Sequence, residues 1–240
     1  MSRLLNSQEA LEFKNLIDDY SLHEDGLKQF QDSNFGIIAG PAGAGKDTLR
    51  NSLTEHYPEL YVPLLSTTTR PPRTGEHNGE TYYFREIEEV RSGLEQREFF
   101  QAELVHNQQV SGLHLDEIRT LAFGQTGLSI LVIEAERKIR VIKPSVKTVF
   151  LIPPDVATLT ARMQSERMLD DAEINRRLDA ARTEIGYALE TQDYYCLVSD
   201  TIENVLSAAH GFFQNSERSE ALNATARAVM RQILDTLNDW

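Results

Sequence analysis

The sequence predicts an α/β fold built on a doubly wound parallel sheet. Apolar runs at residues 35–39, 128–134 and 147–152 are typical of central strands that are buried on both faces. Stretches with helical spacing separate these runs, and strands that alternate with helices predict a parallel sheet covered by helices on both sides. A glycine-rich turn joins the first run to the helix that follows it.

The remaining elements follow from apolar spacing and from residues that begin or end helices. Ser7 is expected to cap the first helix. Helices are expected directly after Lys46 and over residues 7–20, 22–31, 86–95, 155–167, 171–190, 200–213 and 216–239. Strands are expected over residues 61–66 and 194–199, and a loop over residues 67–81.

The composition excludes several classes of function. A net charge of −13 over 240 residues argues against a nucleic-acid binder, because phosphate backbones attract basic surfaces. No apolar run approaches the roughly 20 residues that span a bilayer, and the first residues lack a signal-peptide pattern. We therefore expect a cytoplasmic protein without a membrane partner. Cys196 is the sole cysteine, lies in an apolar run and is expected in the core.

The glycine-rich turn Gly40-Pro41-Ala42-Gly43-Ala44-Gly45-Lys46 predicts a phosphate-binding loop of the P-loop NTPase type. Glycines let the backbone turn tightly and aim its N–H groups at phosphate oxygens, and the following helix adds the positive end of its dipole. Lys46 then reaches the outer phosphates of ATP. The expected ATP-binding residues are Gly40, Ala42, Gly43, Ala44, Gly45, Lys46, Asp47 and Thr48.

Magnesium is expected beside the ATP phosphates. A serine or threonine usually follows the loop lysine and helps to hold the ion, but here Asp47 and then Thr48 follow Lys46. Thr48 can supply the hydroxyl, and Asp47 can contact the ion or its waters. Alternatively, Asp47 is a first-turn acid favoured by the helix dipole.

A second anion-binding loop is expected over residues 66–84. Arg70 and Arg73 lie three apart beside prolines, so that their guanidinium groups can fork onto one phosphate, and the hydroxyl of Tyr82 can complete the grip.

These two motifs together resemble those of guanylate kinases, over roughly residues 35–213. The resemblance implies a small nucleoside-monophosphate-binding subdomain at about 66–115 and a short lid at about 162–172. Residues 1–34 would form a helical extension and residues 214–240 a C-terminal helix. It also implies that Arg70, Arg73 and Tyr82 hold the acceptor's phosphate, while Ser66 and Glu76 shape the site.

The positions that read the base depart from the family pattern. Gln101 stands where guanylate kinases have a glutamate that accepts guanine N–H groups, whereas an amide offers one acceptor and one donor. Without a gap, Val110 and Gly112 replace the family's tyrosine and hydroxyl residue. A one-residue gap places Gln109 and Ser111 there instead and keeps the hydroxyl.

Two further motifs resemble the family's. Glu134-Ala135-Glu136 corresponds to its Asp-x-Asp, and Glu134 is expected to face magnesium or the acceptor. Arg162, Arg167 and Arg177 correspond to arginines of the lid region, which would neutralise the phosphoryl group in flight together with Lys46.

We therefore expect an enzyme that uses Mg-ATP to phosphorylate a nucleoside monophosphate, with GMP or dGMP first, acting as a monomer or homodimer. Two alternatives stay open. One is a kinase for another phosphomonoester, such as a modified nucleotide or ribose 1,5-bisphosphate. The other is a non-catalytic interaction domain that has the guanylate kinase shape.

Overall fold

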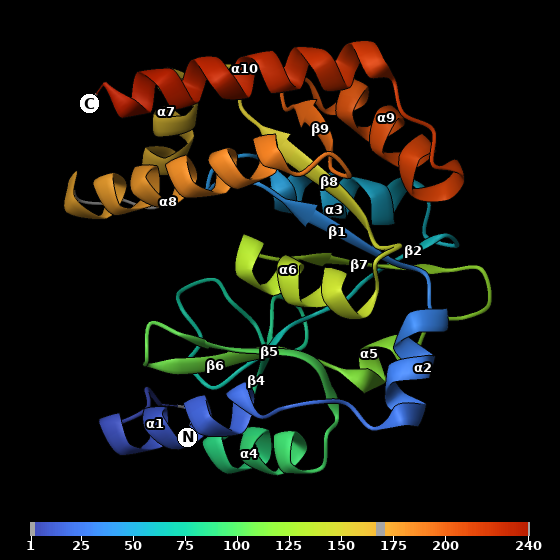
Figure 1. The fold of residues 1–240 in the computed structure, drawn as a ribbon, viewed down its shortest axis with the longest axis vertical. Coiled ribbons are helices and arrows are strands. Elements are labelled where there is room, and N and C mark those ends of the chain that lie inside the picture. Colours follow the sequence, from blue (N-terminus) through green and yellow to red (C-terminus); the bar gives the residue numbers. More distant parts are fainter. Residues whose placement is uncertain (1–2, 167–170, 240) are drawn as a thin grey trace. The chain divides into compact units, whose positions relative to one another are not determined.

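The computed structural model describes residues 3–166 and 171–239 and divides into two compact units (Figure 1). The first unit comprises Met1–Asn34, Val62–Ser129 and Arg137–Ser145. The second comprises Phe35–Tyr61, Ile130–Glu136 and Val146–Trp240. The chain therefore passes several times between the units, and each unit is described by itself.

The first unit is built around a four-stranded sheet with the strand order β4-β3-β6-β5. Its strands are β3 (Thr67–Thr68), β4 (Tyr83–Phe84), β5 (Phe99–Val105) and β6 (Gln109–His114). Strands β3 and β4 are parallel, whereas β6 runs antiparallel to both β3 and β5. Strands β2 (Tyr61–Pro63) and β7 (Thr126–Ile130) lie mainly in this unit, where the Leu64 N–H donates to the Leu128 carbonyl at 2.9 Å.

Helices cover one face of this sheet. Helix α1 (Ser7–Asp18) contacts both β5 and α4 (Ile87–Glu95). Their shared apolar cluster, here the N-terminal cluster, consists of Leu5, Ala10, Phe13, Ile87, Val90, Leu94, Phe99, Ala102 and Val110. Helix α2 (Glu24–Asp32) packs against β5 and α5 (Leu115–Arg119).

The first helix begins at Ser7, but its cap is Asn6, so the predicted Ser7 cap was wrong. A capping box explains this: Asn6 Oδ1 accepts from the Glu9 N–H at 3.0 Å, and Glu9 Oε2 accepts from the Asn6 N–H at 2.8 Å.

Strand β5 contains a bulge. Phe99 pairs with His114 and Gln101 pairs with Leu113, so Phe100 is one residue more than β6 can match. Side chains alternate along a strand, but the extra residue resets the alternation. Phe99 and Ala102, three residues apart, consequently both lie in the N-terminal cluster. Gln101 therefore points to the opposite face of the sheet.

The second unit contains three parallel strands in the order β1-β8-β9. These are β1 (Phe35–Ala39), β8 (Lys147–Ile152) and β9 (Tyr195–Val198). Helices α3 (Lys46–His56) and α9 (Ile202–Asn215) contact each other, and α3 also contacts β1. Helix α10 (Glu220–Asn238), red in Figure 1, packs on β9 and α8 (Asp171–Glu190), and α8 contacts α7 (Val156–Glu166). Cys196 is buried as expected, and burial raises the pKa of its thiol to about 11.

One expected strand was partly wrong. The apolar run 128–134 holds the end of β7 at Ile130 and the start of helix α6 (Ile133–Ile142). Ala135 and Ile139, four residues apart, are buried on one side of this helix, and Ile133 is buried at its start. A short apolar run cannot distinguish a buried strand from the buried start of a helix, so Glu134 lies in a first helical turn and not at a strand end.

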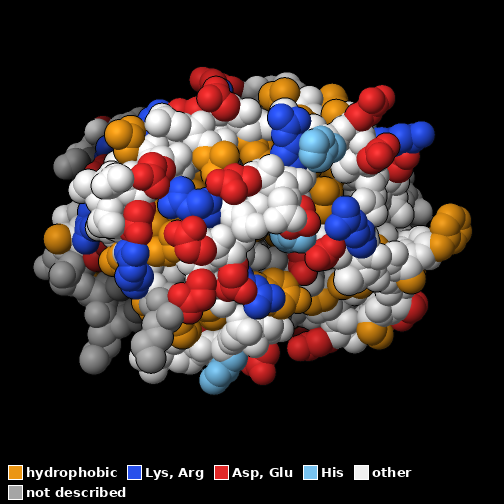
Figure 2. Space-filling view, turned by 90° about the horizontal axis from the view of Figure 1, so that it is seen from below, with side chains coloured by type: hydrophobic (Ala, Val, Ile, Leu, Met, Phe, Trp, Pro, Cys, Tyr) orange, Lys and Arg blue, Asp and Glu red, His pale blue; other side chains and the backbone are white. Residues whose placement is uncertain are grey.

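Charged residues make up 25% of the sequence. On the face shown in Figure 2, acidic and basic side chains are intermixed around small apolar areas. Among the described helices, none is long and apolar enough to cross a membrane.

Candidate active site

The predicted phosphate loop connects β1 to α3 in the second unit. Gly40, Gly43 and Gly45 have positive φ angles of 137°, 76° and 87°, which favour glycine. A Cβ at Gly40 would lie 2.3 Å from the Leu151 carbonyl oxygen, so no side chain fits there. Gly45 is the N-cap of α3 and has no side chain to cover the first-turn N–H groups. The loop thus presents backbone donors at a helix start, as anion binding requires.

Lys46 begins α3 and folds back over the loop. Its Nζ donates to the carbonyls of Gly40 and Pro41, both at 2.8 Å. Asp47 is 77% exposed and lies 3.3 Å from Arg50 Nη2, while Thr48 is exposed and lines a neighbouring pocket. Lys46 and Thr48 thus lie at the loop, and the described contact of Asp47 is an ion pair along its own helix.

A pocket of about 220 Å³ adjoins the loop. It is lined by Gly43, Gly45, Thr48, Leu49, Leu151, Arg162, Ser199, Asp200, Thr201, Ile202 and Val205. Arg162 of α7 forms one wall, because its Nη1 donates to Ser199 Oγ and its Nη2 to the Ser199 carbonyl, both at 2.9 Å. Its lining combines apolar side chains, such as Leu49, Leu151 and Val205, with polar groups, which suits a nucleoside.

The sequence analysis missed one buried acid in this half of the site. Burial raises the pKa of Glu184 in α8 to about 7, opposed by the charge of Lys46 and increased by that of Glu134. The charges of Lys46, Glu134 and Glu184 therefore interact. Glu184 Oε2 is buried without a hydrogen-bond partner among the described residues. More than 130 residues separate Glu184 from Lys46 in the sequence, so no local pattern pointed to it.

For the other residues predicted near the phosphate loop, the described contacts are with residues outside the loop. Arg177 donates from Nε to Glu173 Oε1 at 3.0 Å along α8. Glu136 is fully buried and accepts hydrogen bonds from Thr148 Oγ1 at 3.0 Å and the Tyr194 hydroxyl at 2.5 Å, so it helps to hold the core. Arg167 lies outside the described residues.

The predicted arginine loop belongs to the first unit. Arg70 is only 6% exposed, and its two terminal nitrogens donate to both carboxylate oxygens of Glu76 at 2.5 and 2.8 Å. These hydrogen bonds lower the pKa of Glu76. Glu76 Oε2 also accepts from the Arg73 backbone N–H at 2.8 Å. The carboxylate of Glu76 thus fixes both the Arg70 fork and the turn that carries Arg73.

Aromatic rings pack against the same guanidinium. The Arg70 Cζ lies 4.9 Å from the ring centre of Tyr82 and 5.4 Å from that of Phe84, within cation–π range. The Ser66 carbonyl accepts from the Tyr83 N–H at 3.0 Å and thereby holds the strand that follows Tyr82. Arg73 itself is exposed.

The β-sheet register decides which residues accompany Arg70. Thr68 pairs with both Ser111 and Phe84, and Ser111 pairs with Glu103, so these side chains share one face with Gln101. We name this the Gln101 face; it carries Thr68, Phe84, Gln101, Glu103 and Ser111. Val110 and Gly112 lie on the other face, where Val110 is buried in the N-terminal cluster. Gln109 and Ser111, as in the gapped alignment, are therefore the residues that share the face of Gln101.

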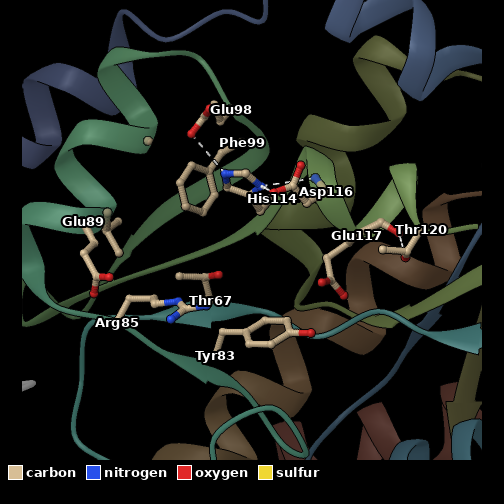
Figure 3. Close-up of a pocket in the computed structure, with 12 residues that line it drawn as sticks. Thr67, Tyr83, Arg85, Glu89, Glu98, Phe99, His114, Asp116, Glu117 and Thr120 are labelled. Atoms are coloured by element: carbon tan, nitrogen blue, oxygen red, sulfur yellow. Dashed lines mark hydrogen bonds and ion pairs between the residues drawn. The ribbon is translucent and has the colours of Figure 1, made fainter.

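A larger pocket, of about 400 Å³, lies in the first unit beside α4 and α5 (Figure 3). Its charged lining residues are Arg85, Glu89, Glu98, His114, Asp116 and Glu117. His114 lies between Glu98, at 3.2 Å, and Asp116, at 3.3 Å, and burial raises the pKa of Glu117. Carboxylates outnumber cations here, so this pocket does not suit a phosphorylated acceptor.

Comparison with known proteins agrees with the two motifs. The family model described as guanylate kinase matches residues 32–235. Guanylate kinase from Synechococcus elongatus is 34% identical over 174 residues, covering 72% of this chain and 92% of the relative. Guanylate kinase from Anaeromyxobacter dehalogenans is 34% identical over 210 residues, covering 85% and 92%.

A solved structure extends this similarity to the fold. The crystal structure of guanylate kinase from Anaplasma phagocytophilum aligns with a TM-score of 0.58 and 22% identity, covering 79% of this chain and 89% of that chain. At this identity the alignment supports a common fold, while the family match and the curated relatives establish the kinship. The chain therefore belongs to the guanylate kinase family.

Proposed function

We propose that this protein transfers the γ-phosphoryl group of ATP to GMP or dGMP, giving ADP and GDP or dGDP. The observation that carries the proposal is the phosphate loop of a guanylate kinase family member, with its three positive-φ glycines and Lys46 at the start of α3. The intact loop with Lys46 favours an enzyme over a non-catalytic interaction domain.

On the donor side, the N–H groups of the loop and Lys46 hold the ATP phosphates. The nucleoside of ATP occupies the pocket of about 220 Å³ between Gly43, Arg162 and Ser199. Arg162 is held there by Ser199 and lies beside the loop, because a Cβ at Gly43 would lie 3.2 Å from the Arg162 Cβ. Arg162, Arg177 and, from its sequence position, Arg167 neutralise charge on the transferred group.

On the acceptor side, Arg70, Arg73 and Tyr82 hold the phosphate of GMP, with Ser66 and Glu76 supporting the loop. Glu76 holds the Arg70 fork flat and in place before any ligand arrives, which lowers the entropic cost of binding. The base lies against the Gln101 face, where Gln101 and Ser111 offer an amide and a hydroxyl.

The residues around the loop fit a magnesium ion, because Thr48 and Asp47 supply oxygen ligands, which this hard cation prefers, and both side chains are exposed. Thr48 and Asp47 would hold the ion or its waters, and Glu134 is a further candidate. When bound, the ion neutralises phosphate charge.

The chemistry needs positioning more than acid–base catalysis. An oxygen of the acceptor phosphate forms a bond to the γ-phosphorus while the bond from that phosphorus to the bridging oxygen breaks, and ADP leaves with the electron pair. Lys46 and the arginines stabilise the charge that develops on the transferred phosphoryl group in the transition state.

A coupled assay of ADP release with a panel of acceptors tests the proposal. The panel contains GMP, dGMP, IMP, AMP, UMP and ribose 1,5-bisphosphate at equal concentrations. We expect GMP or dGMP to give the highest kcat/KM. A higher kcat/KM for another acceptor would assign that substrate instead. If none of the acceptors stimulated ADP release, the proposal would be contradicted.

A further inference from the structure

Residues before the family match hold the strand that carries Gln101. Tyr20, just after α1, donates its hydroxyl to the Phe99 carbonyl at 2.6 Å and accepts from the Phe99 N–H at 2.9 Å. Burial raises the pKa of this hydroxyl to about 12, so it keeps its proton and can both donate and accept. One side chain thus saturates both backbone groups of Phe99, the residue directly before the β5 bulge.

Two more contacts from the same segment reach β5 and its turn. Phe30 of α2 stacks on Phe100, the extra residue of the bulge, with ring centres 4.5 Å apart and planes inclined by 18°. The Leu5 N–H donates to the Gln108 carbonyl in the turn between β5 and β6 at 2.7 Å. Residues 5, 20 and 30 therefore grip the bulge and the turn, and all three precede residue 32, where the family match begins.

The bulge decides where Gln101 points. In a regular strand Gln101 would share the face of Phe99 and enter the N-terminal cluster. With the bulge, Gln101 lies on the other face and is only 5% exposed. Its Nε2 is buried without a hydrogen-bond partner among the described residues. A buried amide without partners is costly, and this one is left able to pair with a ligand.

We propose that Tyr20 is a positioning residue for the acceptor's base: it fixes the bulge at Phe99 and thereby holds Gln101 on the face that reads the base. This inference rests on the proposed function for its ligand. The structural part of the inference, that Tyr20 fixes the bulge and so the direction of Gln101, involves only Tyr20, Phe99 and Gln101, all within the first unit. The N-terminal segment is then part of the machinery of specificity.

The Tyr20→Phe variant removes only the hydroxyl, and Tyr61→Phe is its matched control. Tyr61 is also a buried tyrosine, bonded to His210 Nδ1 at 2.9 Å, but it belongs to the second unit. We expect Tyr20→Phe to weaken GMP binding, measured by calorimetry without ATP, by about tenfold. The KM for GMP should rise similarly while kcat and the KM for ATP change little. Tyr61→Phe should bind GMP as the wild type does.

A double-mutant cycle separates positioning from general loosening of the fold. If Tyr20 acts through Gln101, Tyr20→Phe should cost no further GMP affinity in a Gln101→Ala background. Equal losses in both backgrounds, or unchanged GMP affinity in Tyr20→Phe, would overturn the proposal even where the melting temperature falls.

Hydrogen exchange measured without any nucleotide tests only whether Tyr20 fixes the bulge. Tyr20→Phe should speed exchange at residues 99–102 and leave α3 unchanged. Unchanged exchange at residues 99–102 would overturn the role of Tyr20, whatever the acceptor is. Absence of GMP binding to the wild type would instead contradict the proposed function.

Discussion

The proposed donor half and the proposed acceptor half use different parts of the chain for recognition. The donor half in the second unit is made mainly of backbone: three positive-φ glycines, a helix start and one lysine. The acceptor half in the first unit is made of side chains, chiefly Arg70 with Glu76 and the Gln101 face. A backbone site is fixed as soon as its glycines are present, whereas a side-chain site depends on strand register and on neighbours. Substrate identity can therefore change through the second half while the first stays intact.

The largest effect is expected in the donor half. Lys46→Ala should lower kcat/KM roughly thousandfold, because the charge that faces the outer phosphates is lost. Steady-state kinetics and ATP binding measure this. Lys14→Ala, on the exposed side of α1, serves as the control. Unchanged turnover and ATP affinity in Lys46→Ala would contradict the assignment of the phosphate loop.

Glu184 adds a dependence of stability on pH to the donor half. Its folded pKa of about 7 lies above the ordinary 4.5, so ionisation costs the folded state. The cost is absent below about pH 4.5, grows up to about pH 7 and is complete above it. It reaches about 3 kcal/mol at 1.36 kcal/mol per pH unit. Glu184→Gln should therefore unfold at higher urea concentration than the wild type at pH 8, and at a similar one at pH 4.5. An equal difference at both pH values would contradict this.

In the acceptor half, binding should depend on the geometry of the Arg70 guanidinium more than on its charge. Arg70→Lys keeps the positive charge but loses the fork that Glu76 holds, so the KM for GMP should rise roughly a hundredfold. The KM for ATP should stay within about twofold. Arg85→Lys, in the same unit beside the acidic pocket, is the control. Similar kinetics for both lysine variants would remove Arg70 from the phosphate grip.

The smallest effect concerns the base itself. Gln101→Glu would provide two acceptors for the N–H groups of guanine, where the amide provides one. The preference for GMP over IMP, which lacks the exocyclic amino group, should then rise by about tenfold. The ratio of the two kcat/KM values measures it. A ratio that stays constant would place the base away from Gln101.

The same contrast explains what could be predicted from the sequence. Strands 35–39 and 147–152 were predicted to the residue, because buried apolar runs bounded by glycine, proline or charge have few alternatives. The bulge in β5 was not predicted, because it depends on Tyr20, almost 80 residues away in the sequence. Glu184 was missed for the same reason. The sequence also left open whether the family motif aligns with or without a one-residue gap after Gln101. Only the register of β5 on β6 shows that Gln109 and Ser111 share the face of Gln101.

Strand β5 is the last strand of its sheet, so one side of its backbone pairs with no other strand of the described chain. Exposed edges of this kind invite pairing with other chains and so promote aggregation. Tyr20 occupies the outward N–H and carbonyl of Phe99, and Leu5 occupies the carbonyl of Gln108 in the turn that follows β5. The N-terminal segment consequently covers the start of this sheet edge and the turn at its other end, where it leaves fewer backbone groups open to another chain.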